Sequence, residues 1–113
     1  MNILSFNKKF KKTLLIIENI INKNEEKIDI DYIFSENMIN ITFKNKKKII
    51  INSQEYLKQL WIATSNQGYH LTFNKNTWKC IRTKKKIANI LEKEFLNQTK
   101  NIIYFSCLNN IKK

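Results

Sequence analysis

The stretch from residue 49 to residue 71 constrains the fold more than any other part of the chain. It begins with a β-branched apolar run, passes through a polar segment around Asn52 and Gln54, and becomes apolar again around Trp61. A third such segment follows Gly68, the only glycine, where we expect a turn that needs a positive φ. Strands joined by such short connections pair antiparallel, because parallel neighbours need a crossover of about a dozen residues. The sequence therefore predicts a three-stranded antiparallel meander.

Two amphipathic helices and further strands are predicted on either side of this meander. Apolar residues recur at three- and four-residue steps over residues 3–22, and again over residues 87–97. Alternating apolar residues predict strands over 28–34 and 38–43, and a last strand over 78–82. Helices with one apolar stripe and half-buried strands pack as two layers. We therefore predict an α+β fold, a two-layer sandwich in which an antiparallel sheet of five to six strands carries the N- and C-terminal helices on one face.

The length of the chain, 113 residues, suffices for one domain with a single core. We place this domain at residues 1–113, and the sequence leaves the conformation of the polar tail, 106–113, undefined. The longest apolar run near the N-terminus stops at Glu18, far short of a membrane span. The first twenty residues lack arginine and a small-residue cleavage signal. We therefore expect a soluble, cytoplasmic monomer without membrane association, whose two separate cysteines are reduced thiols.

The formal net charge of +12 bears on the class of partner. Clustered lysines neutralise phosphates, so a small basic nucleic-acid-binding domain that uses Lys46–Lys48 and Lys84–Lys86 is an alternative function. However, Arg82 is the only arginine, whereas base readout and bidentate phosphate contacts favour arginine. Lysine, asparagine and isoleucine also have A/T-rich codons, so base composition can produce such a surface, and we expect no nucleic-acid partner. A third alternative, attachment to a membrane surface, requires the helical stripe with Phe6 and Phe10 to be unpacked.

A motif in the central stretch is similar to the signature of a known family. It combines Ile51-Asn52-x-Gln54, Gln59-x-Trp61-x-Ala63 and Gly68-Tyr69-His70 in this order and spacing. This pattern resembles the frataxin family in its bacterial form, and the resemblance extends more weakly from the first helix to about Phe105. Two departures are that Tyr56 stands where the family usually has proline, and that this chain is basic where the family is acidic. The resemblance implies an iron-binding accessory or regulator of iron-sulfur cluster assembly, with a cysteine desulfurase and a scaffold protein as partners.

Acidic residues are concentrated in one segment of the chain. Six of the nine lie between positions 18 and 36, where only Lys23 and Lys27 are basic, so this segment has a net charge of −4. If the first helix packs beside the first strand, five of these carboxylates can share one edge. We call them the acidic ridge: Glu18, Glu25, Glu26, Asp29 and Asp31.

Carboxylate oxygens in a solvated cluster suit hard cations such as ferrous or ferric iron, at weak and exchangeable affinity. The resemblance implies the same role, because in frataxins the corresponding edge binds iron and docks on the cysteine desulfurase. This chain has Asn19, Asn22 and Lys23 where the family is usually acidic. Alternatively, the ridge carboxylates only make an exposed edge soluble.

The outer face of the sheet is the second candidate surface. The resemblance implies that Asn52, Gln54 and Trp61 are exposed and contact the assembly machinery. A tryptophan on a solvated face is a frequent interface anchor, although core packing is the more usual place for so large a side chain. Trp78 is assigned to the core. The only histidine, His70, has no nucleophile or carboxylate at a catalytic spacing, so we predict no enzymatic activity.

Overall fold

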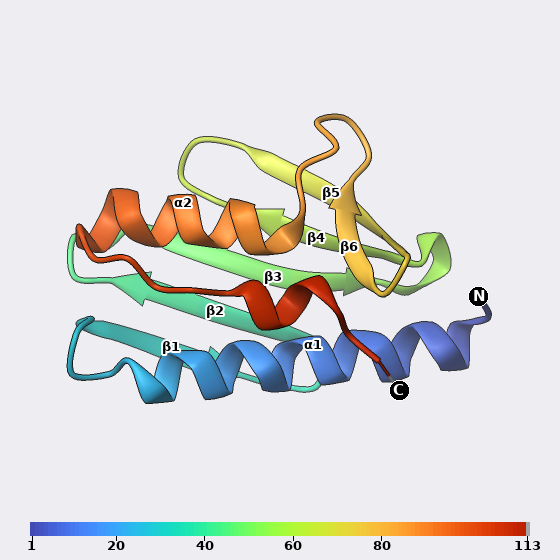
Figure 1. Cartoon of the computed structure of the whole chain (residues 1–113), viewed down its shortest axis with the longest axis horizontal. Helices are drawn as coiled ribbons and strands as arrows, with labels where there is room; N and C mark the ends of the chain where they lie inside the picture. Colours follow the sequence, from blue (N-terminus) through green and yellow to red (C-terminus); the bar gives the residue numbers. More distant parts are fainter. Residues whose placement is uncertain (113) are drawn as a thin grey trace.

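Two long helices and six strands make up the computed structural model, which describes residues 1–112 (Figure 1). The helices are α1 (Ile3–Lys23) and α2 (Ile87–Thr99), with two short 3-10 helices, η1 (Glu55–Leu57) and η2 (Ser106–Asn109). The strands are β1 (Ile30–Phe34), β2 (Met38–Phe43), β3 (Lys48–Gln54), β4 (Gln59–Ala63), β5 (Gly68–Asn74) and β6 (Thr77–Cys80). Each strand pairs antiparallel with the next, so the order in the sheet is β1 to β6.

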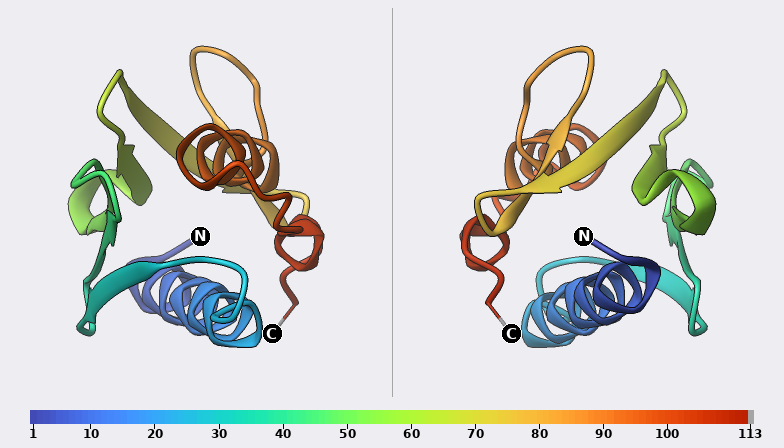
Figure 2. Two further views of the ribbon diagram at one scale, coloured as in Figure 1. Left: turned by 90° about the vertical axis from the view of Figure 1, so that its left-hand side faces the viewer. Right: turned by 90° about the vertical axis from the view of Figure 1, so that its right-hand side faces the viewer.

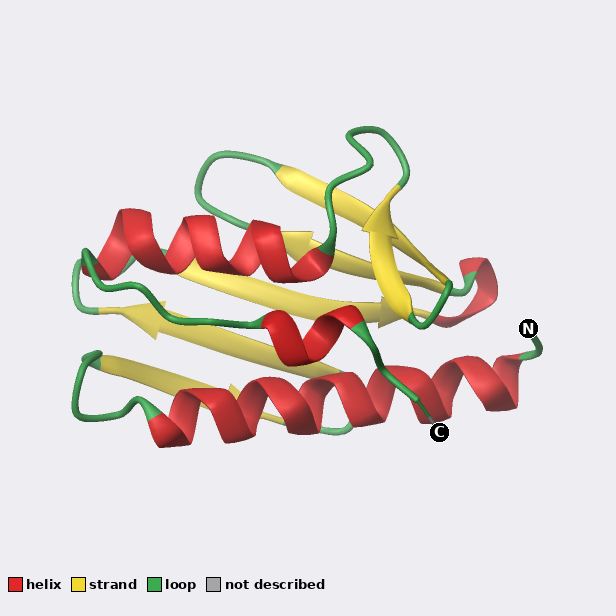
Figure 3. Cartoon of the chain, in the orientation of Figure 1, coloured by secondary structure: helices red, strands yellow, loops and turns green. Residues whose placement is uncertain are grey.

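Both helices lie on the same side of a curved sheet, as the end-on views show (Figure 2). In the broad view, α1 runs beside the edge strand β1, and α2 lies farther across the sheet, with the C-terminal segment between the helices (Figure 3). The predicted α+β sandwich is confirmed, with six strands. The predicted strand bounds differ most at two places: β1 begins at Ile30 rather than residue 28, and β6 ends at Cys80 rather than residue 82.

The sequence of α1 explains its position on the sheet. Asn2 caps the start of the helix, because its Oδ1 accepts a hydrogen bond from the Ser5 N–H at 2.8 Å. The buried side chains form one stripe: Phe6, Phe10, Thr13, Leu14, Ile17, Ile20 and Ile21. Ile3, which we predicted in the stripe, is 39% exposed. Attachment to a membrane surface would require this apolar stripe to be exposed. The stripe is packed against the sheet, which argues against membrane attachment through it. No helix within residues 1–112 is both long and apolar enough to cross a bilayer.

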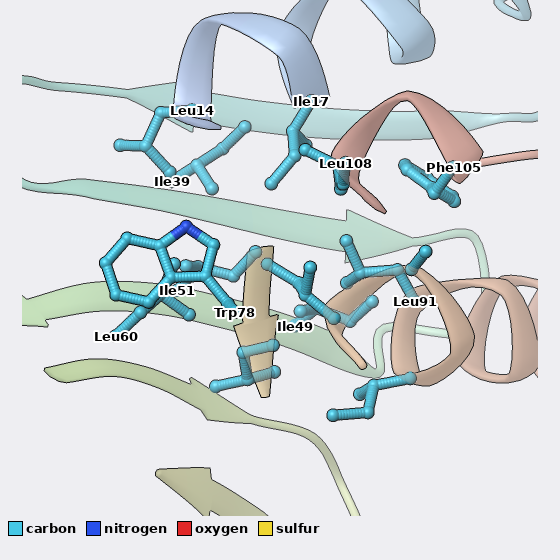
Figure 4. Packing of buried hydrophobic residues seen from close by; sticks show 14 of the residues in the cluster. Leu14, Ile17, Ile39, Ile49, Ile51, Leu60, Trp78, Leu91, Phe105 and Leu108 are labelled. Carbon is cyan, nitrogen blue, oxygen red and sulfur yellow. The ribbon is translucent and has the colours of Figure 1, made fainter. Parts of the chain in front are cut away.

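Trp78 joins the two layers at the centre of the core. It is fully buried, and its ring meets those of Phe6 and Phe73 edge-on, at centroid distances of 5.7 and 5.0 Å. Its Nε1 donates a hydrogen bond to Thr13 Oγ1 at 2.8 Å, so the buried indole N–H has a partner. Trp78 thus ties β6 to α1, which confirms the packing role predicted for it. Aliphatic side chains from the helices, the strands and the C-terminal segment surround it (Figure 4).

Positive φ angles occur at residues other than glycine. Gly68 has no positive φ, so the predicted left-handed turn there is wrong; it opens β5 instead, opposite Ala63. Positive φ is found at Lys46, Lys58, Lys75, Asn76, Lys84 and Lys100. In the β2–β3 hairpin Lys46 adopts this geometry, and Asn45 Oδ1 accepts a hydrogen bond from the Lys47 N–H at 3.0 Å. A tight hairpin turn requires a residue with positive φ at this position. The pairing of β2 with β3 imposes that φ on the residue that occupies the position, whatever its type.

The C-terminal segment packs into the core. Ile103, Phe105, Leu108 and Ile111 are all buried. Thr77 Oγ1 donates to the Leu108 carbonyl oxygen at 2.7 Å, and the Ile111 N–H donates to the Asn76 carbonyl oxygen at 2.6 Å. The tail that the sequence left undefined is therefore a structural element up to residue 112, whereas Lys113 lies outside the described residues.

We expect Leu108→Ala to lower the free energy of unfolding by about 2–5 kcal/mol, because it removes a fully buried side chain and leaves a cavity. Ile102→Ala is the matched control, since Ile102 is 59% exposed in the same segment, and should change stability by at most about 0.5 kcal/mol. Urea unfolding followed by circular dichroism measures both. Equal stabilities of the two variants would contradict the packing described for the tail.

Candidate functional site

The first candidate surface lies where α1 contacts β1. The Tyr32 hydroxyl of β1 is 3.0 Å from Glu18 Oε2 and 3.1 Å from Asn22 Oδ1, both on α1. Burial raises the pKa of the Tyr32 phenol, and the hydrogen bond and negative charge of Glu18 raise it further, with a smaller effect from the charge of Glu25. The structure therefore brings Glu18 and Asn22 to one phenol, whereas Glu25 acts on it only through its charge. No role for Tyr32 was predicted from the sequence. However, successive side chains of a strand point to opposite faces, so Tyr32 points toward the helix layer when Asp31 points away from it.

The other three ridge residues do not join this contact. Glu26 is exposed in the turn between α1 and β1. Asp29 lines a small hollow together with Lys27 and Lys44, whose positive charges reduce the negative potential there. Asp31 is exposed in β1, opposite Thr42 in β2. Within residues 1–112, no three or more His, Cys, Asp or Glu side chains are placed so that they could hold a metal ion. The ridge is thus a spread of carboxylates along one edge, of which Glu18 is hydrogen-bonded to Tyr32.

The second candidate surface lies on the sheet face that is turned away from the helices. Asn52, Trp61 and His70 are neighbours in the pairing of β3, β4 and β5. The Trp61 and His70 rings stack at a centroid distance of 4.0 Å and an interplanar angle of 7°. Trp61 is half-buried and His70 is exposed, and neither belongs to the core. The alternative that placed Trp61 in the core is therefore wrong.

Side-chain hydrogen bonds order this surface. Trp61 Nε1 donates to Gln59 Oε1 at 2.8 Å, and Gln54 Nε2 donates to Asn52 Oδ1 at 3.3 Å. We call these residues the sheet-face patch: Asn52, Gln54, Gln59, Trp61 and His70. Gln59 and His70 were not predicted as site residues, but a strand period of two and antiparallel pairing put them beside Trp61.

One residue of the acidic ridge shares the outer face of the sheet with the sheet-face patch. Asp31 pairs with Thr42, and Thr42 pairs with Lys48. Lys48 is four residues from Asn52 in β3, so both point to the same side of the sheet. Asp31 therefore shares a face with the sheet-face patch, while Glu18 lies around the edge on α1. Paired strands hold such side chains in fixed relative positions, as a docking surface requires.

The cysteines take no part in either surface. Cys80 is buried and Cys107 is exposed, and both are free thiols, as predicted. Burial opposes ionisation of Cys80, but hydrogen bonds from the Thr83 side chain and from nearby backbone groups lower the pKa of its thiol overall.

Comparison with known proteins places this chain and its fold in a family. A family model described as a frataxin-like domain matches residues 1–101. The iron-sulfur cluster assembly protein CyaY of Buchnera aphidicola subsp. Baizongia pistaciae is 45% identical over 94 residues, which are 83% of this chain and 80% of that protein.

Solved structures agree with the sequence relatives. Frataxin from Psychromonas ingrahamii, of the CyaY protein family, has a TM-score of 0.87 at 28% identity, covering 93% of this chain and 98% of that one. Trimeric frataxin from Saccharomyces cerevisiae, complexed with ferrous iron, has a TM-score of 0.64 at 18% identity, covering 80% and 87%, and shares the fold. The chain described here belongs to the frataxin family, with bacterial CyaY proteins among its relatives.

Proposed function

We propose that this protein is a non-enzymatic, iron-binding accessory and regulator of iron-sulfur cluster assembly that acts on a complex of a cysteine desulfurase and a scaffold protein. The observation that carries the proposal is the sheet-face patch, where Trp61 lies outside the core and stacks on His70. The similarity to CyaY, an iron-sulfur cluster assembly protein, supports it.

The sheet-face patch has the composition of a docking surface. Partner binding would remove the accessible part of the Trp61 ring from water, and amide groups beside the ring can donate and accept hydrogen bonds with a partner. Large aromatic side chains supply most of the binding free energy in many interfaces. Because the Trp61 indole is already oriented by Gln59 and His70, little side-chain entropy is lost when a partner binds.

The acidic ridge supports weak cation binding. Carboxylate oxygens are suitable ligands for iron, and Glu18 and Glu25 act on the same phenol of Tyr32. With the carboxylates spread along the edge, each ion is held by one or two of them and otherwise by water, which gives low and exchangeable affinity. Asn19, Asn22 and Lys23 make the negative potential around Glu18 weaker still. The iron is a cargo of this surface and not a resident cofactor.

Anaerobic titration with Fe²⁺, followed by backbone amide signals in NMR, tests the ridge. We expect signals between residues 18 and 31 to broaden at millimolar metal, because paramagnetic iron would lie close to them. The double variant Glu18→Gln with Glu25→Gln should lose most of this broadening, whereas Glu55→Gln, which removes an exposed carboxylate from η1, should keep it. Sharp and unshifted ridge signals in the unmodified protein would remove iron binding from the proposal.

Trp61→Ala tests the sheet-face patch. The variant should melt within a few degrees of the parent, because Trp61 is outside the core. Its dissociation constant for the desulfurase and scaffold complex should rise on the order of 30-fold, as for the loss of an interface anchor. Tyr104→Ala is the control, since Tyr104 is an aromatic residue 72% exposed elsewhere. Unchanged affinity of Trp61→Ala, measured by co-purification and calorimetry at moderate salt, would contradict the docking role.

A further inference from the structure

An apolar groove lies next to the acidic ridge, between α1 and the end of β1. Its volume is about 370 Å³ and its wall is almost wholly apolar. The residues that line it are Lys11, Leu14, Leu15, Phe34, Ser35 and Glu36. Leu14 is fully buried, whereas Leu15 is 48% exposed and Phe34 is half-buried. The groove therefore has a hydrophobic wall, and the side chains of Leu15 and Phe34 in that wall are partly exposed to solvent.

The groove lies along the same contact between α1 and β1 that includes Glu18 of the acidic ridge. Leu15 precedes Glu18 by about one helical turn on α1, a rise of about 5 Å. On β1, Phe34 follows Tyr32 by two residues, so both rings face the helix layer. Glu18 with Tyr32, and Leu14 and Leu15 with Phe34, are thus successive levels of one contact between α1 and β1. A partner segment that lies along this contact meets a negative charge first and an apolar groove immediately beside it.

Charge indicates which kind of partner fits both levels. The segment from residue 18 to residue 36 has a net charge of −4 in a protein of net charge +12, so a basic segment is attracted here and repelled from the remaining surface. Lys11 in the groove wall, Lys23 and the asparagines at positions 19 and 22 weaken that attraction. Burial of apolar area does not depend on these charges, and in the groove it adds affinity that the ridge alone does not provide.

We propose that the groove receives one apolar side chain of the partner that the ridge attracts. The partner segment carries an aliphatic or aromatic residue next to a lysine or arginine; the basic group pairs with Glu18 and the apolar group enters beside Leu15 and Phe34. This inference rests on the proposed function, because the partner is the assembly complex named there. The groove thereby adds side-chain specificity to an attraction that charge alone leaves unspecific.

The salt dependence of binding separates the two contributions. Dissociation constants for the desulfurase and scaffold complex are measured at roughly 0.05 M and 0.5 M salt. Leu15→Gln should weaken binding about fivefold to tenfold at both concentrations, because it removes apolar burial and no charge. Glu18→Gln with Glu25→Gln should weaken binding at low salt and approach the parent at high salt.

Matched variants exclude general effects of the substitution. Leu96→Gln makes the same change at a residue 43% exposed on α2, and should bind as the parent does. Leu15→Met keeps the apolar surface and should also bind normally. Because Leu15 is half-exposed, all of these variants should remain folded, which thermal melts check.

The possible results distinguish the groove inference from the proposed function. Parental affinity of Leu15→Gln at both salt concentrations overturns the groove inference and leaves the proposed function intact. Absence of binding by the unmodified protein at both concentrations overturns the proposed function and the inference with it. Loss of a dimer in Leu15→Gln, seen by analytical ultracentrifugation with unchanged affinity for the complex, would make a second copy of this chain the occupant and overturn the inference.

Discussion

The packing of α1 against the sheet beside the edge strand β1 determines which surfaces this protein presents. The buried stripe of α1 fixes the rotation of the helix about its axis, because Phe6 and Thr13 are held by Trp78 on β6. Once that rotation is set, the flank of the helix with Leu15 and Glu18 must lie over β1. The position of the ridge and of the groove is thus a consequence of core packing. The core residues of α1 therefore determine where the surface residues of the same helix lie.

The division of charge is the second organising feature. Acidic residues gather between residues 18 and 36, from the end of α1 to the turn after β1, while the remaining chain is strongly basic, so this segment differs in the sign of its charge from the rest of the protein. Such an asymmetry orients a charged partner before contact, and short-range groups then decide whether it stays. On the outer face of the sheet those groups are the aromatic stack and amides of the sheet-face patch, with Asp31 on the same face. On the helix side they are the apolar walls of the groove.

Most of the sheet could be derived from the sequence, because one-sided burial enforces a period of two. In β2, Ile39, Ile41 and Phe43 are buried as predicted. The errors lie where local signals are weak or ambiguous. The glycine suggested a left-handed turn, but no residue of the loop between β4 and β5 has a positive φ. Tyr32 carried no motif that would link it to Glu18. The tail was undefined because its buried residues, Leu108 and Ile111, lie in a short segment and show no regular period.

The sequence by itself determined the class of fold, the concentration of acids between residues 18 and 36, and the motif whose family resemblance implied the candidate residues of the sheet face. These are properties of composition, period and spacing, which are readable along the chain. Only the tertiary structure decided that Trp61 lies outside the core on His70, that Asp29 lies near two lysines, and that Leu15 and Phe34 border one groove. Each of these depends on the rotation of a helix or the register of a strand relative to distant residues. Long-range packing sets those two quantities, and no local pattern encodes them.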